Sequence, residues 1–223
     1  MPNTILPGSV QQAPAGLAGF DVNQPLTASN ALDFKNAGYA FCIRYIPRTA
    51  ALLKNNLTNT EAVDILHAGL ALMPVQHVSP ENWIPNTNLG TAYGNFAARY
   101  AAQVVGLPKG VNIWCDLEGV APGVSPNDVI AYCQAWYYAV HTAGYTPGLY
   151  VGFGTLLSPE QLYNDISFQH YWRAYNGPAV ATRGYQLIQK TQKTLNNITF
   201  DPNSTHNDDM GDSALWLSPA GMK

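Results

Sequence analysis

Charged residues are scarce in this sequence, and its basic residues form no run. Asp, Glu, Lys and Arg together make up 11% of the 223 residues, and the formal net charge is −3. Proteins that bind nucleic acid or an anionic membrane surface carry a concentrated basic patch, which this sequence lacks. We therefore expect neither nucleic acid nor a membrane as a partner, and an uncharged ligand suits the composition better.

Cysteine is also rare, and long apolar runs are missing. The three cysteines, Cys42, Cys115 and Cys133, cannot all pair with one another, and two of them lie in apolar strand-like segments, so no disulfide framework is expected. Residues 1–18 show neither the basic start and apolar block of a cleavable signal nor the run of about 18 apolar residues of a membrane span. Export would then need a non-classical or phage-type route.

Apolar residues are plentiful, at 47% of the chain, and suffice for a sizeable core. The length suits one (β/α)8 barrel. We assign residues 1–18, rich in Pro, Gly, Ala and Gln, to an N-terminal arm and residues 19–223 to one barrel domain, and we expect a monomer. The 13 Tyr and 5 Trp suit the stacking of sugar rings, although aromatic residues of the core would give the same count.

From Gly19 onward, short apolar segments alternate with segments of helical periodicity, which is typical of a parallel sheet wrapped by helices. Helices are expected at 60–68, 93–105 and 126–143, each followed by a glycine. Eight candidate strands are the number that a closed α/β barrel of the TIM type needs. They are residues 19–22, 41–46, 72–78, 111–118, 148–152, 171–175, 185–189 and 197–201.

The fourth candidate strand carries two carboxylates, Asp116 and Glu118. Residues two apart on a strand point to the same face, with Cα atoms roughly 6 to 7 Å apart, so the two like charges raise the proton affinity of at least one member. A carboxyl that keeps its proton near neutral pH is what glycoside hydrolysis needs as its general acid. Two structural alternatives remain open, in which the pair caps the next helix or binds Arg44.

Other polar residues interrupt apolar strands near their carboxyl ends, where a TIM barrel holds its active site. Asp21 on the first strand and Asp201 on the last would bring two more carboxylates to the same mouth. Arg44 forms either an ion pair with Asp21 inside the barrel or a substrate contact. Gln76 and His77 end the third strand, and a supporting role suits His77 better than catalysis.

These motifs resemble those of glycoside-hydrolase-like barrels related to the family 25 lysozymes. Such barrels open with Gly-x-Asp, carry Asp-x-Glu on a middle strand and finish with Asp-x-Asn. The matching segments here are Gly19-Phe-Asp21, Asp116-Leu-Glu118 and Asp201-Pro-Asn203. Further resemblance lies in Arg44-Tyr45, in Gly144-Tyr145 leading to Gly148-Leu-Tyr150, and in Tyr171-Trp172 with Ala174.

The resemblance implies hydrolysis of a β-1,4 link in peptidoglycan, without a metal or other cofactor. It makes Glu118 the proton donor, while Asp116, Asp21 and Asp201 position the acetamido group of the substrate or stabilise charge. A cell-wall carbohydrate is the expected partner. Candidate residues for binding its sugars are Arg44, Gln76, Tyr150, Trp172 and Gln189.

Two other functions remain open. The first is a barrel that binds cell-wall glycan without cleaving it, because a fold alone does not determine a function. The second is a metal-dependent polysaccharide deacetylase, whose ligands would come from Asp201, His206, Asp208 and Asp209. The irregular spacing of these four residues and the lack of a second nearby histidine disfavour the deacetylase.

Overall fold

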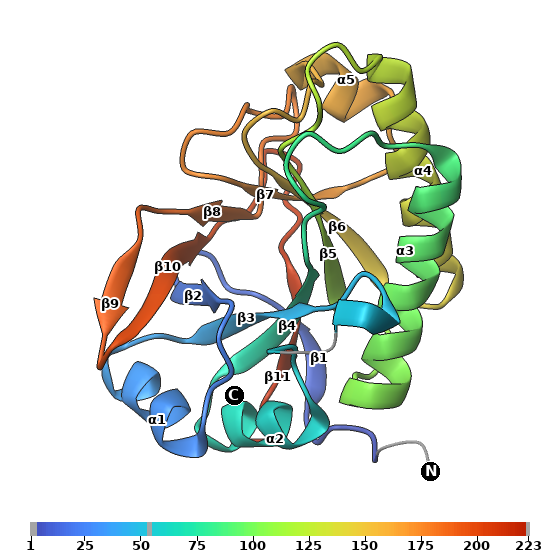
Figure 1. The fold of residues 1–223 in the computed structure, drawn as a ribbon. Coiled ribbons are helices and arrows are strands. Elements are labelled where there is room, and N and C mark those ends of the chain that lie inside the picture. The colour runs from blue at the N-terminus through green and yellow to red at the C-terminus, as the bar shows by residue number, and fades with distance from the viewer. Residues whose placement is uncertain (1–3, 53–54, 222–223) are drawn as a thin grey trace.

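A computed structural model describes residues 4–52 and 55–221 of the chain. Eight of its strands close into a barrel, in the order β4-β3-β2-β10-β8-β7-β6-β5 and back to β4 (Figure 1). The predicted TIM-type barrel is therefore confirmed. The barrel strands are β2 (Ala18–Val22), β3 (Phe41–Ile46), β4 (Ala71–Gln76), β5 (Asn112–Leu117), β6 (Thr146–Val151), β7 (His170–Arg173), β8 (Leu187–Gln189) and β10 (Ile198–Thr205).

The last barrel strand departs from the expected parallel sheet. β10 runs antiparallel to both of its neighbours, β2 and β8. Parallel neighbours need a crossover of about a dozen residues or more, and the chain between β8 and β10 holds only the short strand β9 (Lys193–Leu195) and its turns. Asn196 and Asn197 both adopt left-handed φ angles, 46° and 64°, as a tight turn between β9 and β10 requires.

The three predicted helices are present. They are α2 (Asn59–His67), α3 (Thr87–Tyr100), which continues into the π-helical turn η2 (Ala101–Val105), and α4 (Pro126–Thr142). Each of these helical segments ends near a glycine with left-handed φ, as at Gly69 and Gly144. The prediction missed α1 (Ala28–Asn36), whose polar sequence buries only Ala31 and Phe34, and a short 3-10 turn, η1 (Ala50–Leu52). A further short helix, α5 (Pro159–Asn164), follows β6.

Helices cover the barrel unevenly. Figure 1 shows α3 and α4 side by side along β5 and β6, whereas the described chain from β7 to β10 forms no helix. Gly90 permits the close approach of α3 to α4, since a Cβ atom there would lie 2.3 Å from the Tyr132 carbonyl oxygen. None of the described helices has both the length and the apolar character to cross a membrane.

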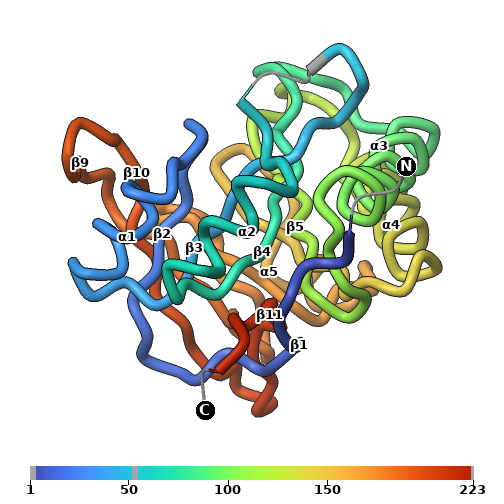
Figure 2. Tube along the Cα trace, turned by 90° about the horizontal axis from the view of Figure 1, so that it is seen from below, coloured from blue at the N-terminus to red at the C-terminus, as the bar shows by residue number. Residues whose placement is uncertain are grey.

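The two ends of the described chain meet beneath the barrel. β1 (Ser9–Gln12) pairs antiparallel with β11 (Leu215–Ser218), and Figure 2 shows the two segments side by side. β11 in turn pairs with the start of β4, through Leu217 and Leu72. The Trp216 ring packs 5.5 Å from that of Phe41, at the start of β3. This layer covers the amino-terminal ends of the strands and leaves the opposite end for a site.

Candidate active site

Four carboxylates gather at the carboxyl ends of the parallel strands. Asp21 lies on β2, Asp116 lies on β5, and Glu118 follows β5 directly. Asp201 pairs with Asp21 across the barrel seam. Because β10 is reversed, Asp201 reaches this end from the first half of its strand rather than from the last.

Asp21 is buried and held by three side-chain donors. Asn203 Nδ2 and Gln189 Nε2 donate to its Oδ2 at 2.7 and 3.0 Å, and the Tyr45 hydroxyl donates to its Oδ1 at 3.3 Å. Burial raises the pKa of Asp21 to about 7, the negative charge of Asp201 adds to the rise, and these hydrogen bonds oppose it. The carboxyl group of Asp21 is therefore expected to titrate near neutral pH.

Asp116 is buried with one oxygen unused. Its Oδ1 atom has no hydrogen-bond partner, although the Val78 backbone N–H donates to the carboxylate. Burial raises the pKa of Asp116 well above its ordinary value, and the charges of Glu118 and Asp21 raise it further. A buried acceptor without a partner calls for an explanation, and a ligand that donates a hydrogen bond provides one.

Glu118 is partly exposed at the rim beside Asp116. Burial raises its pKa, and the charge of Asp201 adds to the rise. Trp83 Nε1 donates to the Glu118 carbonyl oxygen at 2.8 Å, which fixes the backbone. Gly152 makes room for the side chain, because a Cβ atom there would lie 2.5 Å from both Cβ and Oε2 of Glu118. The backbone that carries Glu118 is thus held in place, and the side chain has room at the rim.

Three of the predicted sugar-binding residues, Tyr150, Trp172 and Gln189, join this network. The Tyr150 hydroxyl donates to Gln189 Oε1 at 2.8 Å, and Trp172 Nε1 donates to Asn203 Oδ1 at 2.8 Å. The rings of Tyr150 and Trp172 meet edge to face at 4.6 Å. Trp172 is only 1% exposed, so it forms the floor beneath the carboxylates rather than a surface platform.

The other two, Arg44 and Gln76, point away from the mouth toward the helices. Arg44 is fully buried, and its ion pair is with Glu61 of α2 at 2.5 Å, so the pair with Asp21, one of the two alternatives left open, does not form. Its remaining donors bind main-chain carbonyl oxygens. Gln76 donates to the Tyr93 carbonyl oxygen and accepts from Trp136 Nε1 of α4. Both side chains tie the barrel to its helices.

Two structural explanations of the carboxylate pair fail as well. Arg44 binds Glu61 rather than Asp116 or Glu118. The next helix, α4, is capped by the Ser125 hydroxyl, which accepts from the Asn127 N–H. Neither interaction therefore accounts for the acidic pair.

Tyr45 and Asn203 lie at the site although the sequence analysis gave neither a role there, and His77, for which it expected a supporting role, packs beside Tyr45. Tyr45 follows Arg44 on β3 and faces the interior in its place, since residues alternate along a strand. The ring of Tyr45 packs 4.7 Å from that of His77, whose pKa falls to about 4 through burial and the charges of Arg48 and Arg44. Asn203 lies in the Asp-x-Asn motif, where its two-residue spacing from Asp201 was the available signal.

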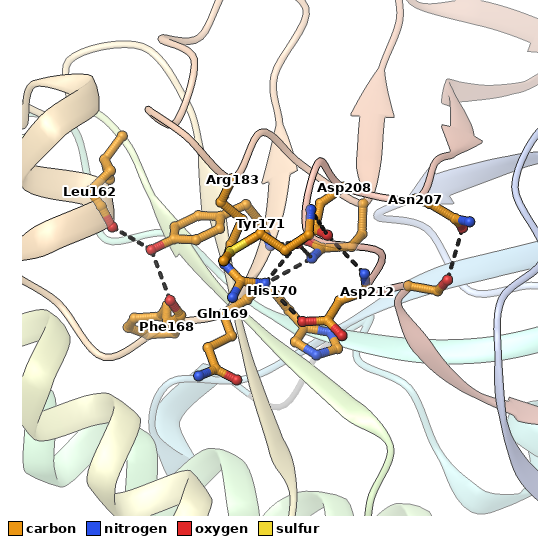
Figure 3. A network of polar contacts seen from close by, with 12 residues as sticks. Leu162, Phe168, Gln169, His170, Tyr171, Arg183, Asn207, Asp208 and Asp212 are labelled. Carbon is orange, nitrogen blue, oxygen red and sulfur yellow. Dashed lines mark hydrogen bonds and ion pairs between the residues drawn. The ribbon is translucent and has the colours of Figure 1, made fainter.

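The four residues considered as metal ligands of a deacetylase do not form one site; they are Asp201, His206, Asp208 and Asp209. Asp208 follows the far end of β10, where its Oδ2 accepts from Arg183 and Gln186 at 2.7 Å each (Figure 3). Arg183 also pairs with Asp212 at 2.8 Å. Asp201 lies near the opposite end of the same strand. Within residues 4–52 and 55–221, no group of three or more His, Cys, Asp or Glu side chains could hold a metal ion.

Solved structures share this fold at low sequence identity. The Tat-secreted protein Rv2525c of Mycobacterium tuberculosis is 17% identical, with a TM-score of 0.65 over 87% of this chain and 98% of that one. A muramidase from Acremonium alcalophilum is 17% identical, with a TM-score of 0.57 over 87% and 95% of the two chains. A family 25 glycosyl hydrolase from Bacillus anthracis is 13% identical, with a TM-score of 0.59 over 88% and 91%.

No curated protein matches the chain in sequence. A family model does: the one described as the Rv2525c-like, glycoside hydrolase-like domain matches residues 32–208. This match takes in Asp116, Glu118 and Asp201, together with all barrel strands except β2. The chain is a member of the Rv2525c-like glycoside hydrolase-like family.

Proposed function

We propose that this protein is a glycoside hydrolase that cleaves cell-wall glycan, with Glu118 as its general acid. The observation that carries the proposal is the pair Asp116 and Glu118 at the barrel mouth, where both pKa values are raised and Asp116 Oδ1 has no partner. Cleavage of a glycosidic bond needs one carboxyl that donates a proton and a second that acts on the developing cation.

Glu118 suits the role of acid because it is the more exposed of the two and its pKa is raised. It would donate its proton to the glycosidic oxygen as the bond to the anomeric carbon breaks. Asp116, beneath it, would act on the developing oxocarbenium or orient a group of the substrate through the unused Oδ1 atom. Two adjacent carboxyls do not readily ionise together, so the pair keeps one proton at a pH where an isolated carboxyl loses it.

Asp21 and Asp201 would support this pair from the other side of the mouth. Asp21 is fixed by Asn203 and Gln189, and the charge of Asp201 raises the pKa of Glu118. The Tyr150 hydroxyl completes the network through Gln189. A rigid polar floor of this kind orients a sugar without rearranging during the reaction.

The solved structures support the substrate class and the compartment. The Acremonium protein is a muramidase, and the Mycobacterium tuberculosis protein is Tat-secreted. We propose by analogy that the present protein acts on peptidoglycan outside the cytoplasm.

Turbidity clearing of purified cell walls tests the proposal. The wild type is expected to clear the walls, and Glu118→Gln should stop the clearing while still sedimenting with the walls. Glu160→Gln, at an exposed position on α5, is the matched control and should clear them as well as the wild type does. Mass analysis of the soluble products should find glycan fragments with one added water for each cut.

The same assay separates the proposal from its alternatives. Wild-type protein that sediments with the walls but never clears them would make the chain a glycan-binding barrel. Release of acetate without shortening of the glycan would point to a deacetylase instead. Either result contradicts Glu118 as a general acid.

A further inference from the structure

Arg48 is a cation near the barrel mouth that forms no ion pair with an acidic residue within residues 4–52 and 55–221. It lies two residues beyond the end of β3, on the same side of the barrel as the carboxylates. Its Nε atom is buried and has no hydrogen-bond partner. Its guanidinium lies 5.7 Å from the centre of the Tyr93 ring. The ion pairs found among the described residues use Arg44 and Arg183 and leave Arg48 out.

The surroundings of Arg48 connect it to the site. Its charge lowers the pKa of His77 and opposes the rise at Asp116, so it acts on both groups. His77 packs on Tyr45, which donates to Asp21. Arg48 therefore borders the network on its β3 side, whereas Glu118 follows β5, two strands away.

A buried charged donor without a partner is costly, and native structures rarely leave one unexplained. The planar guanidinium carries five N–H donors in a geometry that matches a carboxylate. The four carboxylates of this mouth could act as partners of the guanidinium, but none forms an ion pair with Arg48 within the described part of the chain. An acidic group on a ligand would satisfy the guanidinium, and the positive charge of Arg48 would offset the repulsion between that group and the four carboxylates.

We propose that Arg48 binds a carboxylate of the glycan and thereby selects acidic glycans over neutral ones. The inference rests on the proposed function, because it assumes that a glycan enters this mouth. It adds a specificity-determining residue on the β3 side, while bond cleavage stays with Glu118 and Asp116. Hydroxyl groups of a neutral sugar would bind the same guanidinium more weakly.

The test compares two probes that differ at the lactyl group, which is charged in one and neutral in the other. One is a tetrasaccharide of alternating N-acetylglucosamine and N-acetylmuramic acid with free lactyl carboxylates, and the other has those carboxylates converted to methyl amides. Binding is measured by calorimetry in the Glu118→Gln background, so that turnover cannot interfere. The acid should bind at least about tenfold more tightly than the amide.

Arg48→Met should remove this preference by lowering the affinity for the acidic probe alone. Arg48→Lys should keep part of the preference. Arg99→Met is the matched control, because Arg99 lies 5.1 Å from the Phe96 ring in a similar cation–π contact on α3. The Arg99→Met variant should prefer the acid over the amide by the same factor as the protein that carries Glu118→Gln alone. Should Arg48→Met fail to fold, Arg48→Lys and Arg48→Gln give the same comparison.

A hyaluronan tetrasaccharide, which carries uronic acids, distinguishes a hexuronate from a lactyl group as the source of the carboxylate.

Equal affinity for acid and amide, or an equal loss of both in Arg48→Met, would overturn the inference. These outcomes leave the proposed hydrolysis untouched, since they involve no turnover. Conversely, a preference for the acid in a protein that never clears cell walls supports the role of Arg48 and contradicts only the enzymatic proposal.

Discussion

Asp21 and Asp201 face each other across the seam where β2 meets β10, the strand that runs against the rest of the barrel. The charge of Asp201 contributes to the high pKa of Asp21, and Asn203, two residues further along β10, donates to Asp21 at 2.7 Å. The reversed strand thus supplies both a repulsive charge and a compensating donor to the first strand. Several properties of the protein should depend on this seam.

Asp21 should make the protein less stable as the pH rises from about 4 to about 7. Its pKa rises from 3.8 to about 7 on folding, so in that range the folded state binds more protons than the unfolded state, and stability falls with pH. Asn at this position stays neutral, so Asp21→Asn should reduce the loss of unfolding free energy over this pH range by on the order of a few kcal/mol. Urea unfolding at pH 4.5 and pH 7.5 measures the difference.

The exposed Asp165→Asn variant is the control for this measurement and should keep the wild-type slope. An identical slope in Asp21→Asn and in the wild type would show that Asp21 does not titrate in this range.

Gly152→Ala should impair catalysis more than binding. The new Cβ atom would lie 2.5 Å from Glu118 Cβ and Oε2 and would displace the acid. Misplacement by about 1 Å can cost on the order of 100-fold in rate, so kcat should fall by about that factor with little change in glycan affinity. Gly123→Ala adds a Cβ in open space at a left-handed φ and should lower stability alone. Unchanged kcat in Gly152→Ala would contradict the idea that the present position of the Glu118 side chain matters for catalysis.

Asn203→Ala should destabilise the fold and raise the pKa of Asp21 further. It removes the 2.7 Å donor to Asp21 and leaves the buried Trp172 Nε1–H without its acceptor. Each lost partner costs roughly 1–3 kcal/mol. Chemical denaturation measures the loss, with Ser204→Ala on the same strand as the control. A variant as stable as the wild type would mean that water replaces the amide.

Breaking the Arg44–Glu61 pair should destabilise the protein without changing its glycan preference. Removal of one member of a buried ion pair costs about 3–5 kcal/mol, because the other charge stays buried. Arg44→Met with Glu61→Leu should lose less than the sum of the single changes, as a double-mutant cycle would reveal. If Arg44→Met stayed stable but bound glycan poorly, Arg44 would act on the substrate after all.

The sequence by itself determined the barrel and the face that Asp116 and Glu118 share. Alternating apolar segments gave the eight strands, because burial on both sides of a barrel wall selects apolar residues. The two-residue spacing on β5 follows from strand geometry alone. Strand geometry also predicts that the adjacent residues Arg44 and Tyr45 face opposite sides of the sheet. It does not predict which of the two faces the interior of the barrel.

Only the tertiary structure decided that question, because the inner face of a strand depends on its neighbours. Glu61 of α2 draws Arg44 outward and leaves Tyr45 to bind Asp21, and Tyr93 and Trp136 hold Gln76 among the helices. The direction of β10 likewise depends on a short hairpin rather than on its own residues. Local sequence fixes the periodicity of each strand, whereas long-range packing fixes its orientation and its partners.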